Sequence, residues 1–339
     1  MTGAAITEDG FIYALRRVTE AAARAAFDWI GRGRKDEGDA AAVDAMRTVL
    51  NHLDIDGRVV IGEGEKDEAP QLYKGERLGR GANGGPGRDL AVDIAVDPVD
   101  GTSHLAKGQT NALAAVAMTP QGAMFDPGPA FYMEKFAGPP AVRGRIDPLA
   151  PTRDKLRVLA QALGKPVSDL SVYVLEKPRH RRLVEEIHAA GARVALYPAG
   201  DVAGAIVAAM PGGEVDCLMG TGGTPEGVLA ACAIRALGGE FLGRLDPQLE
   251  HERAAVAHAG LDTRRWWGVE ELVRSDKVWF AATGITTGLL FEGVSRRGTS
   301  TRTQSLMLTA PDRQWQVLTT YVETALLGPG AGPTMEARL

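Results

Sequence analysis

The spacing of apolar residues predicts two helices at the start of the chain. Within 11–29, apolar side chains recur three or four positions apart, as they do along one face of a helix: Leu15, Val18, Ala22, Ala26 and Trp29. The Ala-rich stretch 39–50 predicts a second helix, with Asp39 as its N-cap or as an acid of its first turn. The chain therefore opens with helical structure.

Short apolar runs predict strands in the rest of the first half. Residues 58–61 form one run, and 90–96 form another whose unbroken apolar character indicates burial on both faces. Further along, two apolar segments flank the turn residues of 120–123, and this pattern predicts a hairpin with strands 111–119 and 124–125.

Helices and strands alternate from about residue 152. The pattern predicts helices over 154–163, 181–190, 202–210 and 225–237, with strands between them over 171–175, 194–197 and 215–219. Such alternation is typical of βαβ units and a parallel sheet. The end of the chain is again rich in strands, which we expect over 277–282, 289–294, 303–308 and 315–321.

These elements predict an α/β protein built from two halves. The 339 residues suffice for one large or two medium domains at about 150 residues each. We expect an α+β half over 1–165, an α/β half over 166–327 and a loose tail over 328–339 that is rich in Gly and Pro.

Composition narrows the class of protein. Apolar residues at 45% and charged residues at 24% exclude wholesale disorder, and a net charge of −5 argues against a nucleic-acid partner. Cys217 and Cys232 lie in apolar stretches at no metal-ligand spacing, so we expect reduced core thiols. No apolar run is long enough to span a bilayer, and the N-terminus carries no basic leader. We therefore expect a cytoplasmic protein without a membrane partner, and we assign no ligand role to its six histidines.

The sharpest chemical signal is the segment DPVDGT at 97–102. Asp97 and Asp100 leave the end of a buried strand three residues apart, and Pro98 and Gly101 form a tight turn that brings their carboxylates together. Clustered oxygen ligands suit hard cations such as Mg²⁺ or Mn²⁺. A plain turn is the alternative, since Asp-Pro and Asp-Gly are common turn formers. The position after a strand favours the metal site, because ligands bind there in α/β sheets.

Two further acids follow strands. Glu63 lies between glycines, which let its carboxylate approach a metal closely, although a solvated acidic turn is the alternative. Glu226 follows Thr224 and Pro225 at a helix start, where it is either another metal ligand or an acid that complements the helix dipole.

A basic segment offers a phosphate-binding site. Lys177 and Arg179 lie two residues apart between a predicted strand and helix, so both can point into one cleft. Together they would bind a phosphate, Lys177 through the charge of its ammonium group and Arg179 through the paired N–H donors of its guanidinium. Asp201, after Gly200, is either the cap of the next helix or an acceptor for a sugar hydroxyl.

Together these residues predict metal-dependent phosphoryl transfer. Two metals held by shared carboxylates clamp the attacking and leaving oxygens and generate hydroxide near neutral pH. Thr102, next to the predicted ligands, would orient the attacking water and pass a hydrogen bond to Asp39 or a neighbouring acid. No Ser-His-Asp arrangement competes with this interpretation.

The chain resembles a known family of enzymes. DPVDGT after a buried strand is similar to the lithium-sensitive, Mg²⁺-dependent sugar- and inositol-phosphatase superfamily. The wider pattern resembles class II fructose-1,6-bisphosphatases, in ordered stretches between residues 18 and 286: VTEAAARAAFDWIGRG, AAAVDAMR, VVIGEGEKDEAPQLY, AVDIAVDPVDGT, KGQTNALA, FYMEK, KPRH, GDVA, GTGGTPEGV and ATGIT.

The resemblance implies a layered αβαβα sandwich with the site between its halves. It implies divalent metals at five acids: Asp39, Glu63, Asp97, Asp100 and Glu226. Thr102 and Asp39 would be catalytic. Contacts with the sugar phosphate would fall on Asp100, Gly101, Thr102, Tyr132, Lys177, Arg179, Asp201 and Gly223.

Two positions depart from the family pattern. The family often has Glu at the position of Asp100, but Asp is usual in the wider superfamily, so the metal role is kept. An acid is common where this chain has Ala199, so the contact with one sugar hydroxyl is in question. The resemblance implies hydrolysis of the 1-phosphate of fructose 1,6-bisphosphate by a Mg²⁺ or Mn²⁺ enzyme. We expect a homo-oligomer (dimer or tetramer), because most oligomeric enzymes are symmetric assemblies of one chain. A phosphatase for sedoheptulose 1,7-bisphosphate or inositol phosphate, or a sensor without catalysis, is the alternative.

Overall fold

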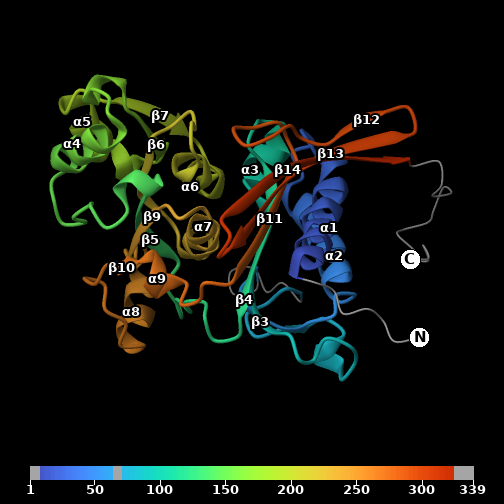
Figure 1. Cartoon of the computed structure of the whole chain (residues 1–339). Coiled ribbons are helices and arrows are strands. Elements are labelled where there is room, and N and C mark those ends of the chain that lie inside the picture. Colours follow the sequence, from blue (N-terminus) through green and yellow to red (C-terminus); the bar gives the residue numbers. More distant parts are fainter. Residues whose placement is uncertain (1–7, 64–70, 324–339) are drawn as a thin grey trace.

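Two β-sheets and three layers of helices alternate through the molecule (Figure 1). The structure is a computed structural model that describes residues 8–63 and 71–323, so the expected tail lies outside the described residues. The layers follow the order αβαβα, which confirms the predicted sandwich. No helix within the described ranges is long and apolar enough to cross a membrane.

The first sheet has eight strands. Its order is β12-β13-β11-β4-β3-β1-β2, and β14 pairs with β13. β1 and β3 run parallel, whereas β3 and β11 both run antiparallel to β4. The strands are β1 (Asp56–Ile61), β2 (Arg77–Leu78), β3 (Ala91–Asp100), β4 (Leu113–Pro120), β11 (Val278–Gly284), β12 (Ser295–Arg297), β13 (Ser300–Ala310) and β14 (Gln314–Glu323).

The second sheet has six strands in the order β10-β9-β5-β8-β6-β7. β6 is parallel to both β7 and β8, as the alternation of elements predicted, but β5, β9 and β10 pair antiparallel. The expectation of a parallel sheet is therefore correct for only half of it. The strands are β5 (Tyr132–Gly138), β6 (Ser171–Leu175), β7 (Arg193–Tyr197), β8 (Cys217–Gly223), β9 (Glu240–Leu245) and β10 (Trp267–Gly268).

Helices cover both faces of each sheet. α1 (Glu8–Phe27) and α2 (Lys35–Leu50) pack on the outer face of the first sheet, and α4 (Thr152–Leu163) and α5 (Arg181–Ala189) pack on the outer face of the second. α6 (Asp201–Ala209) and α7 (Thr224–Leu237) form the middle layer. Three short helices complete the set: α3 (Thr102–Lys107), α8 (Glu250–His258) and α9 (Val269–Leu272).

The alternation of side chains along the strands explains the layering. In β4, Ala115 and Ala117 belong to the core shared with the middle helices, whereas Val116 and Met118 belong to the core beneath α1 and α2. Every residue of α6 is buried. A helix that is apolar all round is typical of such a central position.

Three sequence predictions need correction. α2 begins at Lys35 rather than at residue 39, so Asp39 lies one turn inside the helix and is not its N-cap. The hairpin of 111–119 with 124–125 is wrong, because β4 pairs with β3 and β11, and Met124 forms only an isolated bridge with Val273.

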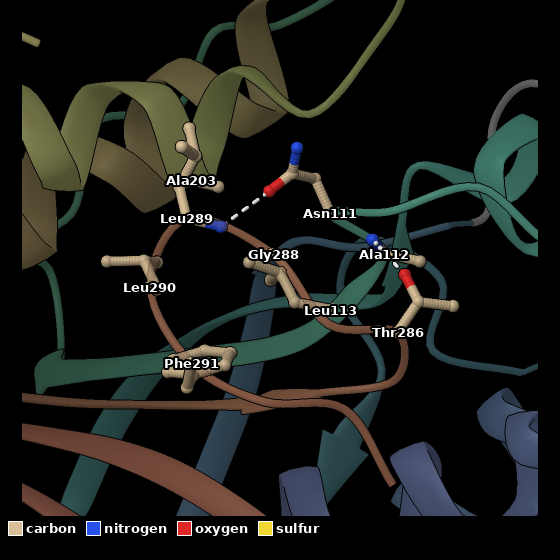
Figure 2. A pocket seen from close by; sticks show the side chains of 9 residues that line it. All are labelled: Asn111, Ala112, Leu113, Ala203, Thr286, Gly288, Leu289, Leu290 and Phe291. Carbon is tan, nitrogen blue, oxygen red and sulfur yellow. Dashed lines mark hydrogen bonds between the residues drawn. The ribbon is translucent and has the colours of Figure 1, made fainter. Parts of the chain in front are cut away.

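The third correction is the strand predicted over 289–294, which is an irregular loop (Figure 2). Close backbone approaches shape this loop, since a Cβ on Gly288 would lie 2.4 Å from Asn111 Oδ1. Asn111 Oδ1 accepts the N–H of Leu289 at 2.7 Å, and Thr286 Oγ1 accepts the N–H of Ala112 at 2.9 Å. The loop is therefore tied to the start of β4 instead of extending a sheet.

The chain passes from the first sheet to the second between β4 and β5, and it returns between β10 and β11. The strands of the first sheet thus come from both ends of the described chain. The division into halves near residue 165 stays a prediction about folding units.

Candidate active site

The acids of DPVDGT lie at the end of β3, next to the end of the parallel strand β1. Asp97 and Asp100 are the seventh and tenth residues of β3, and Glu63 follows β1 by two residues. The pairing of β3 with β4 shifts register between Asp97 and Asp100. This irregularity breaks the strict alternation of faces and lets both carboxylates join one cluster.

Five acids from four elements meet around Asp97. Burial raises the pKa of Asp97, and four neighbouring acids raise it further through their charges: Asp100, Glu63, Glu226 and Asp39. The other four acids that the sequence proposed as metal ligands therefore lie close enough to Asp97 to act on its charge. Their role as ligands stays a prediction.

Asp39 reaches this cluster because a glycine precedes it. A Cβ on Gly38 would lie 2.8 Å from Leu105 Cδ2 and 2.9 Å from Trp29 Cβ, so α2 can approach α3 this closely only with glycine there. Thr102 is the first residue of α3, and it follows Gly101 with φ of +87°. The same turn thus starts α3 directly beyond Asp100.

Glu226 lies in the first turn of α7, beside Gly223. A Cβ on Gly223 would lie only 1.7 Å from Glu226 Oε2, so this carboxylate folds across the backbone of Gly223. Pro225 occupies the first turn, where its missing N–H costs nothing. The Gly-rich segment therefore makes room for the acid.

The donor set fits hard divalent cations. It consists of carboxylate oxygens, and the Oδ2 atom of Asp100 is buried without a hydrogen-bond partner. Within residues 8–63 and 71–323, no three His, Cys, Asp or Glu side chains are already arranged to hold a metal ion.

A basic and aromatic group lies on the second sheet. Arg179, in the turn after β6, donates from Nε and Nη2 to the carbonyl oxygen of Thr221 at 2.9 and 2.8 Å. Its guanidinium stands 5.2 Å from the centre of the Tyr132 ring, and Tyr132 pairs with Gly223 across β5 and β8. Lys177 is exposed in the same turn. The structure thus brings Arg179, Tyr132 and Gly223 together next to Glu226.

Asp201 begins α6, and its carboxylate is in a buried ion pair. The turn before it is held by the hydroxyl of Tyr173, which donates to the carbonyl of Gly200 at 2.8 Å. Lys135 Nζ donates to Asp201 Oδ2, and a Cβ on Gly222 would lie 2.1 Å from that same oxygen. Asp201 is therefore fixed by its partner as well as by its place in the helix.

Lys135 is a site residue that the sequence did not predict. It lies in the inward row of β5 with Met133 and is 4% exposed. Burial and the charges of Asp201 and Glu226 raise the pKa of Asp100, and the ammonium of Lys135 acts in the opposite direction. The available signal was a lysine two residues after the apolar Met133 in the segment FYMEK, so that both would share one face of a strand.

Replacing Lys135 with Met is expected to destabilise the protein. The change leaves Asp201 buried without its cation, and breaking a buried pair from one side costs about 3–5 kcal/mol. We expect a clear fall in the urea midpoint. The double variant Lys135→Met/Asp201→Asn should recover most of the loss, because no unpaired charge remains. A single variant as stable as the wild type would contradict the importance of this pair.

Replacing Asp100 with Asn is expected to stabilise the metal-free protein, measured in EDTA, above pH 5. A carboxyl whose pKa is raised by folding binds more protons in the folded state, so its contribution to stability falls as pH rises above about 4. Asn removes that penalty. In EDTA, thermal unfolding should show a Tm about 2–4 °C above wild type at pH 8 and a smaller gap at pH 5.

With Mn²⁺ present, the wild type should have the higher Tm of the two proteins. Only the wild type keeps all five proposed carboxylate ligands, so it should bind the cation more tightly and gain more stability from it. The exposed Asp262, replaced with Asn, is the matched control and should behave as wild type at every pH. If the Tm difference between Asp100→Asn and the wild type in EDTA became smaller as the pH rises, the prediction would be contradicted.

Comparison with known proteins identifies the family. The chain matches the family described as bacterial fructose-1,6-bisphosphatase, glpX-encoded, over residues 10–322. Fructose-1,6-bisphosphatase 1 class 2 of Escherichia coli strain K12 is 46% identical over 310 residues, which cover 88% of this chain and 90% of that protein. Fructose-1,6-bisphosphatase class 2 of Shigella flexneri is equally similar, at 46% over 310 residues.

One solved structure also aligns with the chain. It is the extragenic suppressor protein SuhB from Bartonella henselae, with a TM-score of 0.41 and 13% identity over 68% of this chain and 86% of that one. The match to the family model spans nearly all the described residues, and the alignment with the Escherichia coli relative covers 88% of the chain. The chain therefore belongs to the bacterial fructose-1,6-bisphosphatase family.

Proposed function

We propose that the protein hydrolyses the 1-phosphate of fructose 1,6-bisphosphate to fructose 6-phosphate and inorganic phosphate. The observation that carries this proposal is the position of the basic group next to the acids. Gly223 contacts the Glu226 carboxylate on one side and pairs with Tyr132, beneath Arg179, on the other. A phosphorylated sugar could therefore reach cations and acids together. The names of the class 2 relatives support this substrate.

The five acids would hold two or more divalent cations, Mg²⁺ or Mn²⁺. The ligands would be Asp39, Glu63, Asp97, Asp100 and Glu226, whose hard oxygen atoms suit these ions. When bound, the cations would lower the pKa of a coordinated water and neutralise charge on the transferred phosphoryl group.

The remaining residues would bind and orient the substrate. The Thr102 hydroxyl, at the start of α3, would accept a hydrogen bond from the attacking water and pass its own to Asp39 or a neighbouring acid. Lys177 and Arg179 would bind a phosphate, with Tyr132 covering the guanidinium. Asp201, held by Lys135, would accept a hydrogen bond from a sugar hydroxyl. Asp100, Gly101 and Gly223 would line the same site.

A related substrate is the second candidate, and the Ala199 position favours testing it. The backbone oxygen of Ala199 accepts a hydrogen bond from Tyr173 at 3.1 Å, and its methyl side chain offers no acceptor where the family has an acid. One hydroxyl of the sugar therefore has fewer possible partners. Sedoheptulose 1,7-bisphosphate and inositol phosphate are the compounds to compare.

Phosphate release distinguishes these possibilities. We expect Mn²⁺- or Mg²⁺-dependent turnover, fastest with fructose 1,6-bisphosphate and slower with sedoheptulose 1,7-bisphosphate and inositol 1-phosphate. Faster turnover of either of the other two would replace the substrate and keep the reaction. Phosphate release from none of them, with either cation, would favour a sensor that binds sugar phosphates without catalysis.

The cellular setting belongs to the same proposal. We expect the protein to work in the cytoplasm as a homo-oligomer, either a dimer or a tetramer. Light scattering on the purified chain would measure the assembly directly.

A further inference from the structure

The turn that carries Lys177 and Arg179 is tied to β8 through a buried histidine. Leu175 O lies 2.6 Å from His180 Nδ1, and the backbone N–H of Thr221 donates to His180 Nε2 at 2.8 Å. Arg179 donates twice to the carbonyl of Thr221. Both backbone groups of Thr221 are therefore bound to this one turn.

These partners define the protonation of the His180 ring. A carbonyl oxygen only accepts and a backbone N–H only donates, so Nδ1 carries the proton and Nε2 carries none. Burial lowers the pKa of His180, and the neighbouring charge of Arg179 lowers it further, while Asp201 on α6 has the opposite effect. The imidazole is therefore neutral near pH 7.

The ring packs directly on the backbone of β8. A Cβ on Gly220 would lie 2.9 Å from His180 Nε2, and Gly220 has φ of +127°, which favours glycine. His180 and Asp201 both line a small cavity of about 10 Å³. Asp246, which accepts a hydrogen bond from the Thr221 hydroxyl at 2.6 Å, is a further charged group beside Thr221.

The two basic residues depend on this contact for their position. The N–H of His180 donates to the carbonyl of Lys177 at 2.9 Å, and the N–H of Lys177 donates to the carbonyl of Leu175 at 2.8 Å. Backbone hydrogen bonds therefore hold both ends of the turn between Leu175 and His180. Arg179 uses Nε and Nη2 on Thr221 and places its guanidinium over Tyr132. Within the part of the chain that the structure describes, Nη1 of Arg179 makes no such hydrogen bond, and the Arg179 side chain is exposed.

We propose that His180 is a positioning residue: its neutral ring holds the Lys177–Arg179 turn on Thr221, so that Arg179 presents Nη1 to a phosphate of the substrate. The substrate part of this inference rests on the proposed function. His180 itself does not touch the ligand. The expected effect of losing it is therefore on the affinity for phosphate and not on the chemical step.

Binding of inorganic phosphate, measured by calorimetry, tests the proposal without any turnover. His180→Ala should weaken binding about tenfold or more, because the turn loses both side-chain hydrogen bonds. His180→Gln, whose Oε1 can still accept from Thr221, should recover most of the affinity. The matched control is His188→Ala, an exposed histidine on α5, which should bind as the wild type does.

The pH dependence separates positioning from a merely structural role. As the pH falls below 6, phosphate binding by the wild type should weaken relative to His180→Gln, because a protonated Nε2 cannot accept from Thr221. The ratio cancels the titration of phosphate itself. In steady-state assays, KM for the sugar bisphosphate should rise in His180→Ala with kcat within about twofold.

Equal phosphate affinity in His180→Ala and the wild type would overturn the proposal, as would a loss of kcat at constant KM. A ratio between wild type and His180→Gln that is independent of pH would also overturn it. If phosphate binding follows the expected pattern while no sugar phosphate is hydrolysed, the proposed function fails and the positioning role stands.

Discussion

Replacing Asp97 with Asn is expected to abolish phosphate release almost completely. Asp97 lies among four other acids, and a neutral amide cannot supply the charge that holds divalent cations between them. Loss of the cations removes several kcal/mol of transition-state stabilisation, and about 4 kcal/mol already corresponds to about a thousandfold in rate. The measurement is kcat/KM with saturating Mn²⁺, together with calorimetric titration of Mn²⁺ into both proteins.

The control for this change is Asp44→Asn. Asp44 lies on the same helix as Asp39, but it is exposed and outside the acid cluster. It should retain wild-type activity and Mn²⁺ binding. Near-normal turnover by Asp97→Asn would mean that the cations bind elsewhere, and the proposed ligand set would have to be abandoned.

Removing the Thr102 hydroxyl is expected to lower kcat about 10²–10³-fold, within the range for loss of a group that assists proton transfer. Thr102→Ala should leave Mn²⁺ affinity unchanged, because the hydroxyl is not among the proposed ligands. Thr102 is half-buried at the start of α3, and Ala is a good helix former. We therefore expect unchanged thermal stability.

Two controls accompany this variant. Thr102→Ser keeps the hydroxyl and should retain most of kcat. Ser103→Ala removes an exposed hydroxyl one residue further along the same helix and should have no effect. If Ser103→Ala lowered kcat as much as Thr102→Ala, a disturbance of α3 would be the simpler explanation, and Thr102 would lose its proposed role.

The acids of the site could be predicted from sequence because of where they lie. Asp97 and Glu63 are at the ends of parallel neighbouring strands, and Glu226 is at the start of a helix. At each position, the Gly or Pro residues of a turn lie next to the end of a strand or the start of a helix, where ligands bind in α/β sheets. Both features can be recognised from a few neighbouring residues.

The contribution of Lys135 and His180 could not be predicted in the same way. Lys135 acts through its contact with Asp201 on α6, which lies 66 positions away in the sequence. His180 depends on the backbone of Thr221, 41 positions away. The residues that neighbour Lys135 and His180 in the sequence do not indicate these tertiary contacts.

The incorrect strand over 289–294 has a similar cause. Its apolar residues resemble those of a buried strand, but they cover a loop that Gly288 and Gly293 allow to fold back on Asn111 and Thr286. Burial of apolar side chains is shared by strands and tightly packed loops. Only tertiary contacts separate the two.

The middle layer limits how this protein can diverge. α6 and α7 contact protein on all sides, and their first residues include Asp201 and Glu226. A larger side chain along either helix would push both sheets apart and shift both acids at once. New substrate preferences can therefore arise more easily outside this layer, for example at Ala199, which is only partly buried in the turn before α6.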